Sequence, residues 1–334
     1  MELGKSFYTK LLILRHRILG LEQYVIDPER EYHKVCESLD GLLIKIGPTS
    51  DTYVNILDIR EDSIEEEQGF LTAKIGKLKG FFSLVFGEMD EDKIALLEET
   101  LIETYKNKGI TLEDKSLYEK GLFKTSKDMP VLEDLYNVFG KRNMNFFKTK
   151  LYPFTKGSLK FLNNHTNIEL ENKLIIADIY ELGEDDLKYG MYIFVELFWD
   201  KIKKDRNINK SIYLDEIWRL IGVTSNKFVA SFIYKIFKTI RKYGGGAVAI
   251  TQDISDLFGL DEGAYGKSIL NNSSIKSFFS LEEENIIILE KYSNISEKEK
   301  IEIACLKKGE NLTIIGEDHI MAKIEASEYE IELI

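Results

Sequence analysis

Buried apolar segments alternate with helical segments in the second half of this chain. The segments KLIIADI (173–179), SIYLDEI (211–217), GGAVAITQD (245–253) and SIKSFFSL (274–281) have the apolar character of buried strands. Helical patterns at 189–204 and 227–243 lie between the first three. Strands that are apolar on both faces, with helices between them, predict an α/β fold with a mostly parallel sheet covered by helices. Ligands of such sheets bind beyond the carboxyl ends of the strands.

The first half begins in the same way and then changes character. A helical pattern at 7–20 precedes QYVIDPEREY (23–32), which predicts a strand and a turn, and 41–48 and 53–59 indicate further extended segments. From about residue 61 to 160 the sequence is rich in Lys, Glu and Leu, and apolar residues recur at helical spacing in 93–109 and 131–143. We expect a helical insertion or subdomain over 61–160. The tail, 312–333, alternates like strands and predicts a closing hairpin.

Composition restricts the classes of function. The formal net charge is −12, which does not favour nucleic-acid binding by the whole surface, although a local basic stripe is compatible with it. Two cysteines exclude a disulfide framework, and the four histidines are too scattered for a zinc site. The most apolar stretch, MYIFVELFW (191–199), is far shorter than the about 20 residues of a membrane span and predicts a buried helix. We expect no secretory signal.

Asp215 and Glu216 follow the apolar run Ile212-Tyr213-Leu214 directly. Two carboxylates at the end of a buried strand are costly unless a cation or a ligand compensates for them. In phosphate-loop NTPases the first carboxylate of such a (Walker B) pair helps to hold Mg²⁺ and the second polarises the attacking water. The alternative is that both acids simply begin a helix, whose first turn favours negative charge.

Gly4-Lys5-Ser6 has the residues that end a phosphate-binding (Walker A) loop, G-x-x-x-x-G-K-[ST]. In such loops the lysine reaches the β- and γ-phosphates and the hydroxyl binds Mg²⁺. These three residues also occur together by chance: Gly266-Lys267-Ser268 is a second copy, which no apolar strand precedes and which predicts ordinary surface. The first copy leads into a helix and a strand. Together with Asp215-Glu216 it predicts an NTPase.

Three weaker candidates complete the predicted site. Gln252, at the end of the strand AVAIT, is placed to sense a γ-phosphate or to orient water, or else belongs to a capping turn. Arg241, at the end of the helix 227–243, is a candidate arginine finger or simply complements the helix terminus. The acidic cluster Asp27, Glu29 and Glu31 ends another strand and is expected to face the same sheet edge, but a solvated turn explains it at least as well.

The order of these elements resembles the C-terminal ATPase domain of the type IV secretion and conjugation ATPases, the TraC/TraE-like family of Gram-positive conjugative elements. The resemblance is carried by Gly-Lys-Ser with its helix, VIDPEREY, a helical insertion, IYLDEIWRLI, IRKYGGGAVAITQD and ILNNSSIKSFF, and it covers nearly the whole chain. It implies a RecA-like, FtsK/HerA-type P-loop NTPase fold with an all-helical insertion. The nucleotide-binding α/β domain then comprises 1–60 and 161–334, separated by the insertion 61–160.

The resemblance also implies ATP and Mg²⁺ as ligands and assigns roles. Lys5 and Ser6, with Gly4 and Phe7 beside them, bind the nucleotide, and Ser6 and Asp215 bind the metal. Glu216, Gln252 and Arg241 are the catalytic residues. The implied partners are other subunits of the secretion channel and further copies of the chain, up to a hexamer. Location in the cytoplasm, attached peripherally to the inner face of the cell membrane, follows from the same resemblance.

Two alternatives remain at this point. One is a DNA-translocating motor of the same superfamily, which the acidic balance does not favour. The other is an inactive docking module of the secretion machinery. It has support because the long N-terminal domain of the family and the first half of the phosphate loop are absent from this sequence. We therefore expect an N-terminally truncated member with fewer backbone N–H donors for the nucleotide phosphates.

Overall fold

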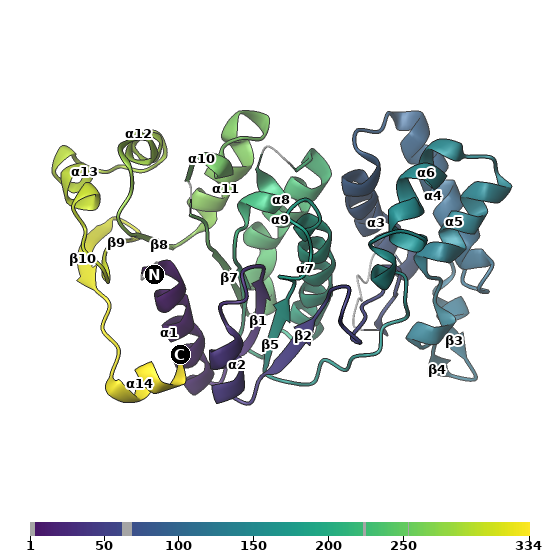
Figure 1. Cartoon of the computed structure of the whole chain (residues 1–334), viewed down its shortest axis with the longest axis horizontal. Helices are drawn as coiled ribbons and strands as arrows, with labels where there is room; N and C mark the ends of the chain where they lie inside the picture. Colours follow the sequence, from purple (N-terminus) through teal and green to yellow (C-terminus); the bar gives the residue numbers. More distant parts are fainter. Residues whose placement is uncertain (1–3, 62–68, 223–224, 253) are drawn as a thin grey trace. The chain divides into compact units, whose positions relative to one another are not determined.

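The chain packs as two compact units in the computed structural model, which describes residues 4–61, 69–222, 225–252 and 254–334 (Figure 1). Unit 1 comprises residues 1–43, 172–176 and 207–334, and unit 2 comprises residues 44–171 and 177–206. The chain therefore leaves the first unit, forms most of the second, and returns twice.

A five-stranded sheet has the order β2-β5-β1-β6-β7. Its strands are β1 (Glu22–Asp27), β2 (Leu42–Lys45), β5 (Leu174–Asp178), β6 (Lys210–Leu214) and β7 (Gly245–Ala249). β6 is parallel to both of its neighbours, with Ile26 opposite Leu214 and Leu214 opposite Ala249. These strands therefore end at one edge, where the chain continues into the segments that carry Glu29, Asp215 and Gln252. The predicted parallel sheet is confirmed.

Helices α1 (Lys5–Ile18) and α2 (His33–Ser38) pack on one face of this sheet. Ile13 of α1 and Val35 of α2 share a fully buried core with Val25 of β1 and Tyr213 of β6. β1, β5 and β6 are buried almost throughout, which is why their sequences are apolar runs and do not alternate with polar residues.

The rest of unit 1 contains a series of helices and a second, smaller sheet. Its elements are α8 (Trp218–Ile221), α9 (Lys227–Thr239), α10 (Ile254–Leu257), α11 (Ala264–Asn272), α12 (Glu283–Tyr292), α13 (Glu297–Ala304) and α14 (Glu328–Leu333). The second sheet, β10-β9-β8, is antiparallel and consists of β8 (Ile275–Phe278), β9 (Glu310–Ile315) and β10 (Asp318–Lys323). The predicted closing hairpin is present as β9 and β10, but the strand prediction is wrong for the end of 312–333, where Glu328–Leu333 forms the helix α14.

Unit 2 is mainly helical and holds a buried charge network. Its helices are α3 (Phe70–Phe86), α4 (Glu91–Lys106), α5 (Leu132–Lys141), α6 (Asn145–Thr155) and α7 (Leu187–Lys204). Glu196 of α7 is 1% exposed and lies 2.8 Å from both Arg60 and Lys74. Asp200, one turn later, lies 2.5 Å from Lys77. The buried lysines of α3 therefore pair with the buried acidic residues of α7 in the interior of unit 2.

Two strand predictions differ from the structure. The segment 274–281 contains a strand, β8, but it pairs antiparallel with β9 and is not part of the parallel sheet. The segment 53–59 is not a strand, although most of it is buried. Its backbone polar groups bond to side chains instead: Asn55 N–H donates to the Thr166 hydroxyl at 2.8 Å, and the Tyr105 hydroxyl donates to the Leu57 carbonyl at 2.6 Å.

In the described part of 61–160 the regular elements are helices and a short hairpin, β3 (Tyr118–Glu119) with β4 (Leu122–Phe123). The apolar stretch 191–199 lies inside the buried helix α7, as expected. In the described ranges, no helix has both the length and the apolar character that a membrane crossing requires.

Candidate functional site

The first turn of α1 contributes one side of a pocket in unit 1. Lys5 and Ser6 are the first two residues of this 14-residue helix and both line the pocket. The ammonium group of Lys5 donates to the Thr251 carbonyl at 3.1 Å, so it reaches toward the end of β7. Gly4 precedes the helix, and a Cβ atom there would lie only 3.0 Å from Phe279. A helix N-terminus with a lysine beside it favours anionic ligands.

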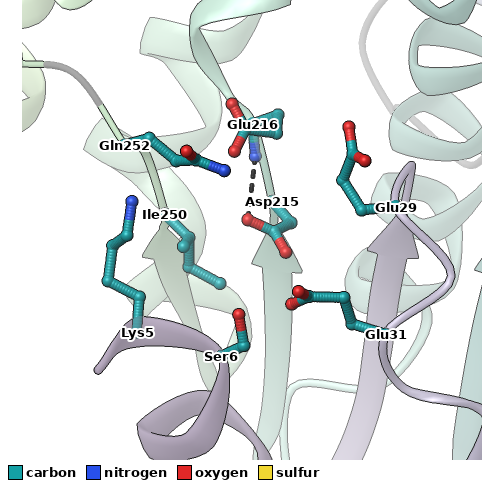
Figure 2. A pocket seen from close by; sticks show the side chains of 8 residues that line it. All are labelled: Lys5, Ser6, Glu29, Glu31, Asp215, Glu216, Ile250 and Gln252. Carbon is teal, nitrogen blue, oxygen red and sulfur yellow. Dashed lines mark hydrogen bonds between the residues drawn. The ribbon is translucent and has the colours of Figure 1, made fainter. Parts of the chain in front are cut away.

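Asp215 and Glu216 enter the same pocket from the end of β6. Both are almost fully buried, and the Glu216 N–H donates to Oδ1 of Asp215 at 3.0 Å (Figure 2). Glu216 has a φ of 50°, in the left-handed region that residues other than glycine seldom adopt. Backbone strain of this kind is concentrated at functional sites. These two acids do not begin a regular helix, because α8 starts only at Trp218.

The environment of Asp215 disfavours its charged form. Burial raises the pKa of the Asp215 carboxyl to about 7, and the nearby carboxylates of Glu216 and Glu31 add to this rise. The Tyr32 hydroxyl opposes it by donating to Oδ2 of Asp215 at 2.8 Å. Burial in turn raises the pKa of Tyr32 well above its usual value, so this hydroxyl keeps its proton. The site therefore has an excess of buried negative charge that a cation would offset.

Ile250 and Gln252 line the pocket from the segment after β7. The Ile250 N–H donates to the Leu214 carbonyl at 3.0 Å, and the Ile217 N–H donates back to the Ile250 carbonyl at 3.2 Å. These bonds continue the pairing of β6 and β7 past their ends and hold Gln252 opposite Lys5 and Glu216 (Figure 2). The next residue, Asp253, lies outside the described residues.

Glu29 and Glu31 complete the lining, from the turn after β1. Asp27, the third member of this acidic cluster, has a different position. It is fully buried, and its carboxylate accepts from the N–H groups of Glu31 and Tyr32, both at 3.0 Å. Asp27 therefore shapes the turn, while Glu29 and Glu31 lie at the pocket.

The pocket brings together most of the residues predicted from the sequence. Figure 2 shows them converging from α1 and from the carboxyl ends of β1, β6 and β7. The full lining is Lys5, Ser6, Glu29, Glu31, Asp215, Glu216, Ile250 and Gln252. One cationic group, Lys5, two neutral polar groups, Ser6 and Gln252, and four carboxylates thus surround a space at the carboxyl edge of the sheet.

Three predicted residues are not among the lining: Arg241, Phe7 and Gly4, which directly precedes α1. Arg241 is exposed on the turn Ile240–Tyr243 that follows α9, and it does not line the pocket. Phe7 is within the first turns of α1 but is not among the lining residues either. The second Gly-Lys-Ser lies inside α11. There Gly266 has a packing role, because a Cβ atom would come within 2.2 Å of the Leu257 carbonyl oxygen.

Two residues at the site escaped the sequence analysis. Tyr32 donates to Asp215, and the indole N–H of Trp218 donates to Oε2 of Glu216. Nothing in the spacing of PEREY indicated that this tyrosine would return to the end of β6. Trp218 did carry a signal, because an indole two residues after a buried carboxylate needs a hydrogen-bond acceptor.

The donor set fits Mg²⁺ better than a metal held by protein ligands alone. Within the described ranges, no group of three or more His, Cys, Asp or Glu residues could hold a metal ion. Mg²⁺ usually binds through one or two carboxylates, waters and the phosphates of a substrate. The Ser6 hydroxyl and the Asp215 carboxylate line one pocket and are hard oxygen donors of this kind.

Comparisons with known proteins agree with this architecture. The model of the TraG P-loop domain family matches residues 103–327. The structure of VirB4 of Thermoanaerobacter pseudethanolicus is similar, with a TM-score of 0.89 and 29% identity over 98% of this chain and 88% of that chain. No curated protein matches the chain.

More distant structures share the fold. The bacterial conjugative coupling protein TrwBdeltaN70 has a TM-score of 0.61 and 12% identity over 98% of this chain and 84% of that chain. The plasmid coupling protein TrwB in complex with ADP and Mg²⁺ has a TM-score of 0.60 and 12% identity, with the same coverage of both chains. The predicted P-loop NTPase fold is thereby confirmed.

Proposed function

This chain belongs to the TraG P-loop domain family, and we propose that it is an ATPase that powers type IV secretion or conjugative DNA transfer. The observation that carries the proposal is the convergence of Lys5, Ser6, Asp215, Glu216 and Gln252 on one pocket at the carboxyl edge of the sheet. The similarity to VirB4, at 29% identity over 98% of the chain, supports the biological setting.

Lys5 and Ser6 bind the phosphates in this account. The N-terminus of α1 supplies partial positive charge and backbone donors, and the Lys5 ammonium adds a full charge. Its bond to the Thr251 carbonyl directs it toward the end of β7. The ammonium group exchanges this carbonyl for the β- and γ-phosphates when ATP binds.

Ser6 and Asp215 would hold Mg²⁺, which offsets the phosphate charge when bound. Glu216 orients and polarises the water that attacks the γ-phosphate in line. Transfer of this kind depends on positioning and on charge stabilisation, so a strained, buried carboxylate with little freedom suits the task. Gln252 senses the γ-phosphate from the end of β7.

Arg241 completes the site from a neighbouring copy of the chain. Its exposed position outside the pocket suits a finger that acts across a subunit interface. This assignment makes a homo-oligomer, up to a hexamer, part of the proposal. Other subunits of the secretion channel are the proposed partners, through which the protein attaches to the inner face of the membrane.

Steady-state phosphate release tests the activity. We expect ATP turnover that requires Mg²⁺ and stops on chelation, with about a hundredfold or greater loss in Glu216→Gln. Donor cells that carry Glu216→Gln in this gene would lose conjugative transfer while producing normal amounts of protein. Turnover that persists in Glu216→Gln would contradict the proposed site, and normal transfer by those cells would contradict the proposed role.

A further inference from the structure

Trp218 contacts the proposed catalytic carboxylate directly. Its indole N–H donates to Oε2 of Glu216, two residues earlier in the chain. Across the part of the chain that the structure describes, this is the hydrogen bond that the Glu216 carboxylate makes. A carboxylate has about four acceptor positions, so the indole leaves room for Glu216 to accept from a water molecule as well.

The backbone of Glu216 is held in one conformation by bonds on both sides. Its φ of 50° is disfavoured for a glutamate. It persists because the Glu216 N–H bonds to Asp215 Oδ1 at 3.0 Å, while the next N–H, of Ile217, bonds to the Ile250 carbonyl at 3.2 Å. The Arg219 N–H donates to the Glu216 carbonyl at 3.1 Å. These bonds fix the backbone, but a glutamate side chain still has three rotatable bonds.

Trp218 is itself restrained on its other side. The Arg219 guanidinium lies over the indole ring, 4.5 Å from its centroid, and 3.8 Å from Oε1 of Glu29, which lines the pocket. A cation over an indole face is attractive, most strongly when it is desolvated, and the side chain of Arg219 is only 11% exposed. The indole N–H therefore points at Glu216 from a ring whose position is set independently.

We propose that Trp218 is a positioning residue that fixes the rotamer of Glu216 for water activation. The inference rests on the proposed function, because it gives Glu216 the role described above. A bond to one oxygen of the carboxylate removes the side-chain freedom that the backbone leaves, before the substrate arrives. Preorganisation of this kind raises kcat and leaves nucleotide affinity unchanged, because Trp218 does not line the pocket.

The chain offers a matched control for Trp218→Phe, which keeps an aromatic ring and removes the N–H. It has two tryptophans, and the second, Trp199, is buried in α7 of unit 2. We expect Trp218→Phe to lower kcat about tenfold to a hundredfold with unchanged KM and nucleotide Kd. Trp199→Phe is expected to keep kcat. In a Glu216→Gln background, Trp218→Phe is expected to cause no further loss.

Fluorescence tests the contact without turnover. Trp199→Phe leaves Trp218 as the sole indole, and adding Glu216→Ala is expected to change its emission. Unchanged emission, an unchanged kcat in Trp218→Phe, or losses that multiply in the Glu216→Gln background would each overturn the proposal. So would a fall in nucleotide affinity and thermal stability that accounts for the lost kcat. No turnover by the folded wild-type protein would instead remove the proposed function, and the role of Trp218 with it.

Discussion

The Tyr32 hydroxyl lies 2.8 Å from Oδ2 of Asp215 and donates a hydrogen bond to it in the protein interior. Tyr32 follows the turn after β1, and Asp215 follows β6, so the bond links two neighbouring strand ends. It stabilises the charged form of a carboxyl group whose pKa burial raises to about 7. Residues that hydrogen-bond to a metal ligand orient it, and their loss typically lowers metal affinity by about tenfold to a hundredfold.

Removing this hydroxyl is expected to weaken Mg²⁺ binding. In Tyr32→Phe the Mg²⁺ concentration for half-maximal turnover should rise about tenfold, because Asp215 loses the donor that favours its charge. The matched control is Tyr24→Phe on β1, where the hydroxyl donates to Glu22 at 3.0 Å away from the pocket. A Mg²⁺ titration of phosphate release distinguishes the two. Equal shifts in both variants would mean that Tyr32 acts only through packing.

Lys5 and Lys267 occupy two copies of the same tripeptide, and only the first is expected to matter. Lys5→Ala should lower kcat/KM for ATP by about a hundredfold, since it removes the full charge that faces the phosphates. Lys267 is exposed on α11, outside the pocket, so Lys267→Ala should behave as wild type. Nucleotide binding and turnover of both variants check this. Normal ATP affinity and turnover in Lys5→Ala would refute the assignment of the phosphate site.

Arg241 is expected to act in trans. Arg241→Ala should lower kcat about a thousandfold with little change in nucleotide affinity, whereas Lys242→Ala at the next exposed position should keep activity. Mixing Arg241→Ala with Glu216→Gln protein should recover turnover, because one interface then combines an intact Glu216 with an intact Arg241. An inactive mixture of proteins that demonstrably co-assemble would argue against a finger from the neighbour.

The buried charges of unit 2 are expected to support its stability. Glu196→Gln should lower the free energy of unfolding by about 3 kcal/mol, because Arg60 and Lys74 would lose a charged partner in the interior. Glu325, which pairs with Lys323 at the surface, provides the control, and Glu325→Gln should leave the denaturation midpoint unchanged. Urea unfolding measures both. A midpoint in Glu196→Gln equal to that of wild type would show that this network contributes nothing to stability.

The sequence was sufficient for the strands of the parallel sheet and for the residues at their ends. Buried strands have apolar sequences, and a polar residue directly after such a strand must lie at the sheet edge, which is why Asp215, Glu216 and Gln252 could be placed. The hydrophobic periodicity of a strand does not specify which strand it pairs with. The segment 274–281 was therefore predicted to belong to the parallel sheet, whereas β8 pairs with β9. The segment 53–59 has the apolar composition of a strand and is mostly buried. It does not form one, because its backbone groups hydrogen-bond to side chains that are distant in the sequence.

The hydrogen bonds that support Glu216 and Asp215 depend on backbone conformations that residue spacing does not specify. The bond from Trp218 to Glu216 requires the left-handed backbone of Glu216, and the bond from Tyr32 requires the turn that Asp27 stabilises. For Glu29 and Glu31 the sequence does not distinguish an acidic cluster at the site from a solvated turn. Both line the pocket, because this turn follows the strand next to β6.

The most direct test compares ATP binding and ATP hydrolysis in wild-type and Glu216→Gln protein under the same conditions with Mg²⁺. The account predicts equal affinity for a fluorescent ATP analogue and a fall in single-turnover hydrolysis of about a hundredfold or more in the variant. Hydrolysis by Glu216→Gln at the wild-type rate, or folded wild-type protein that binds no ATP, would contradict the central claim that this pocket is an ATPase site.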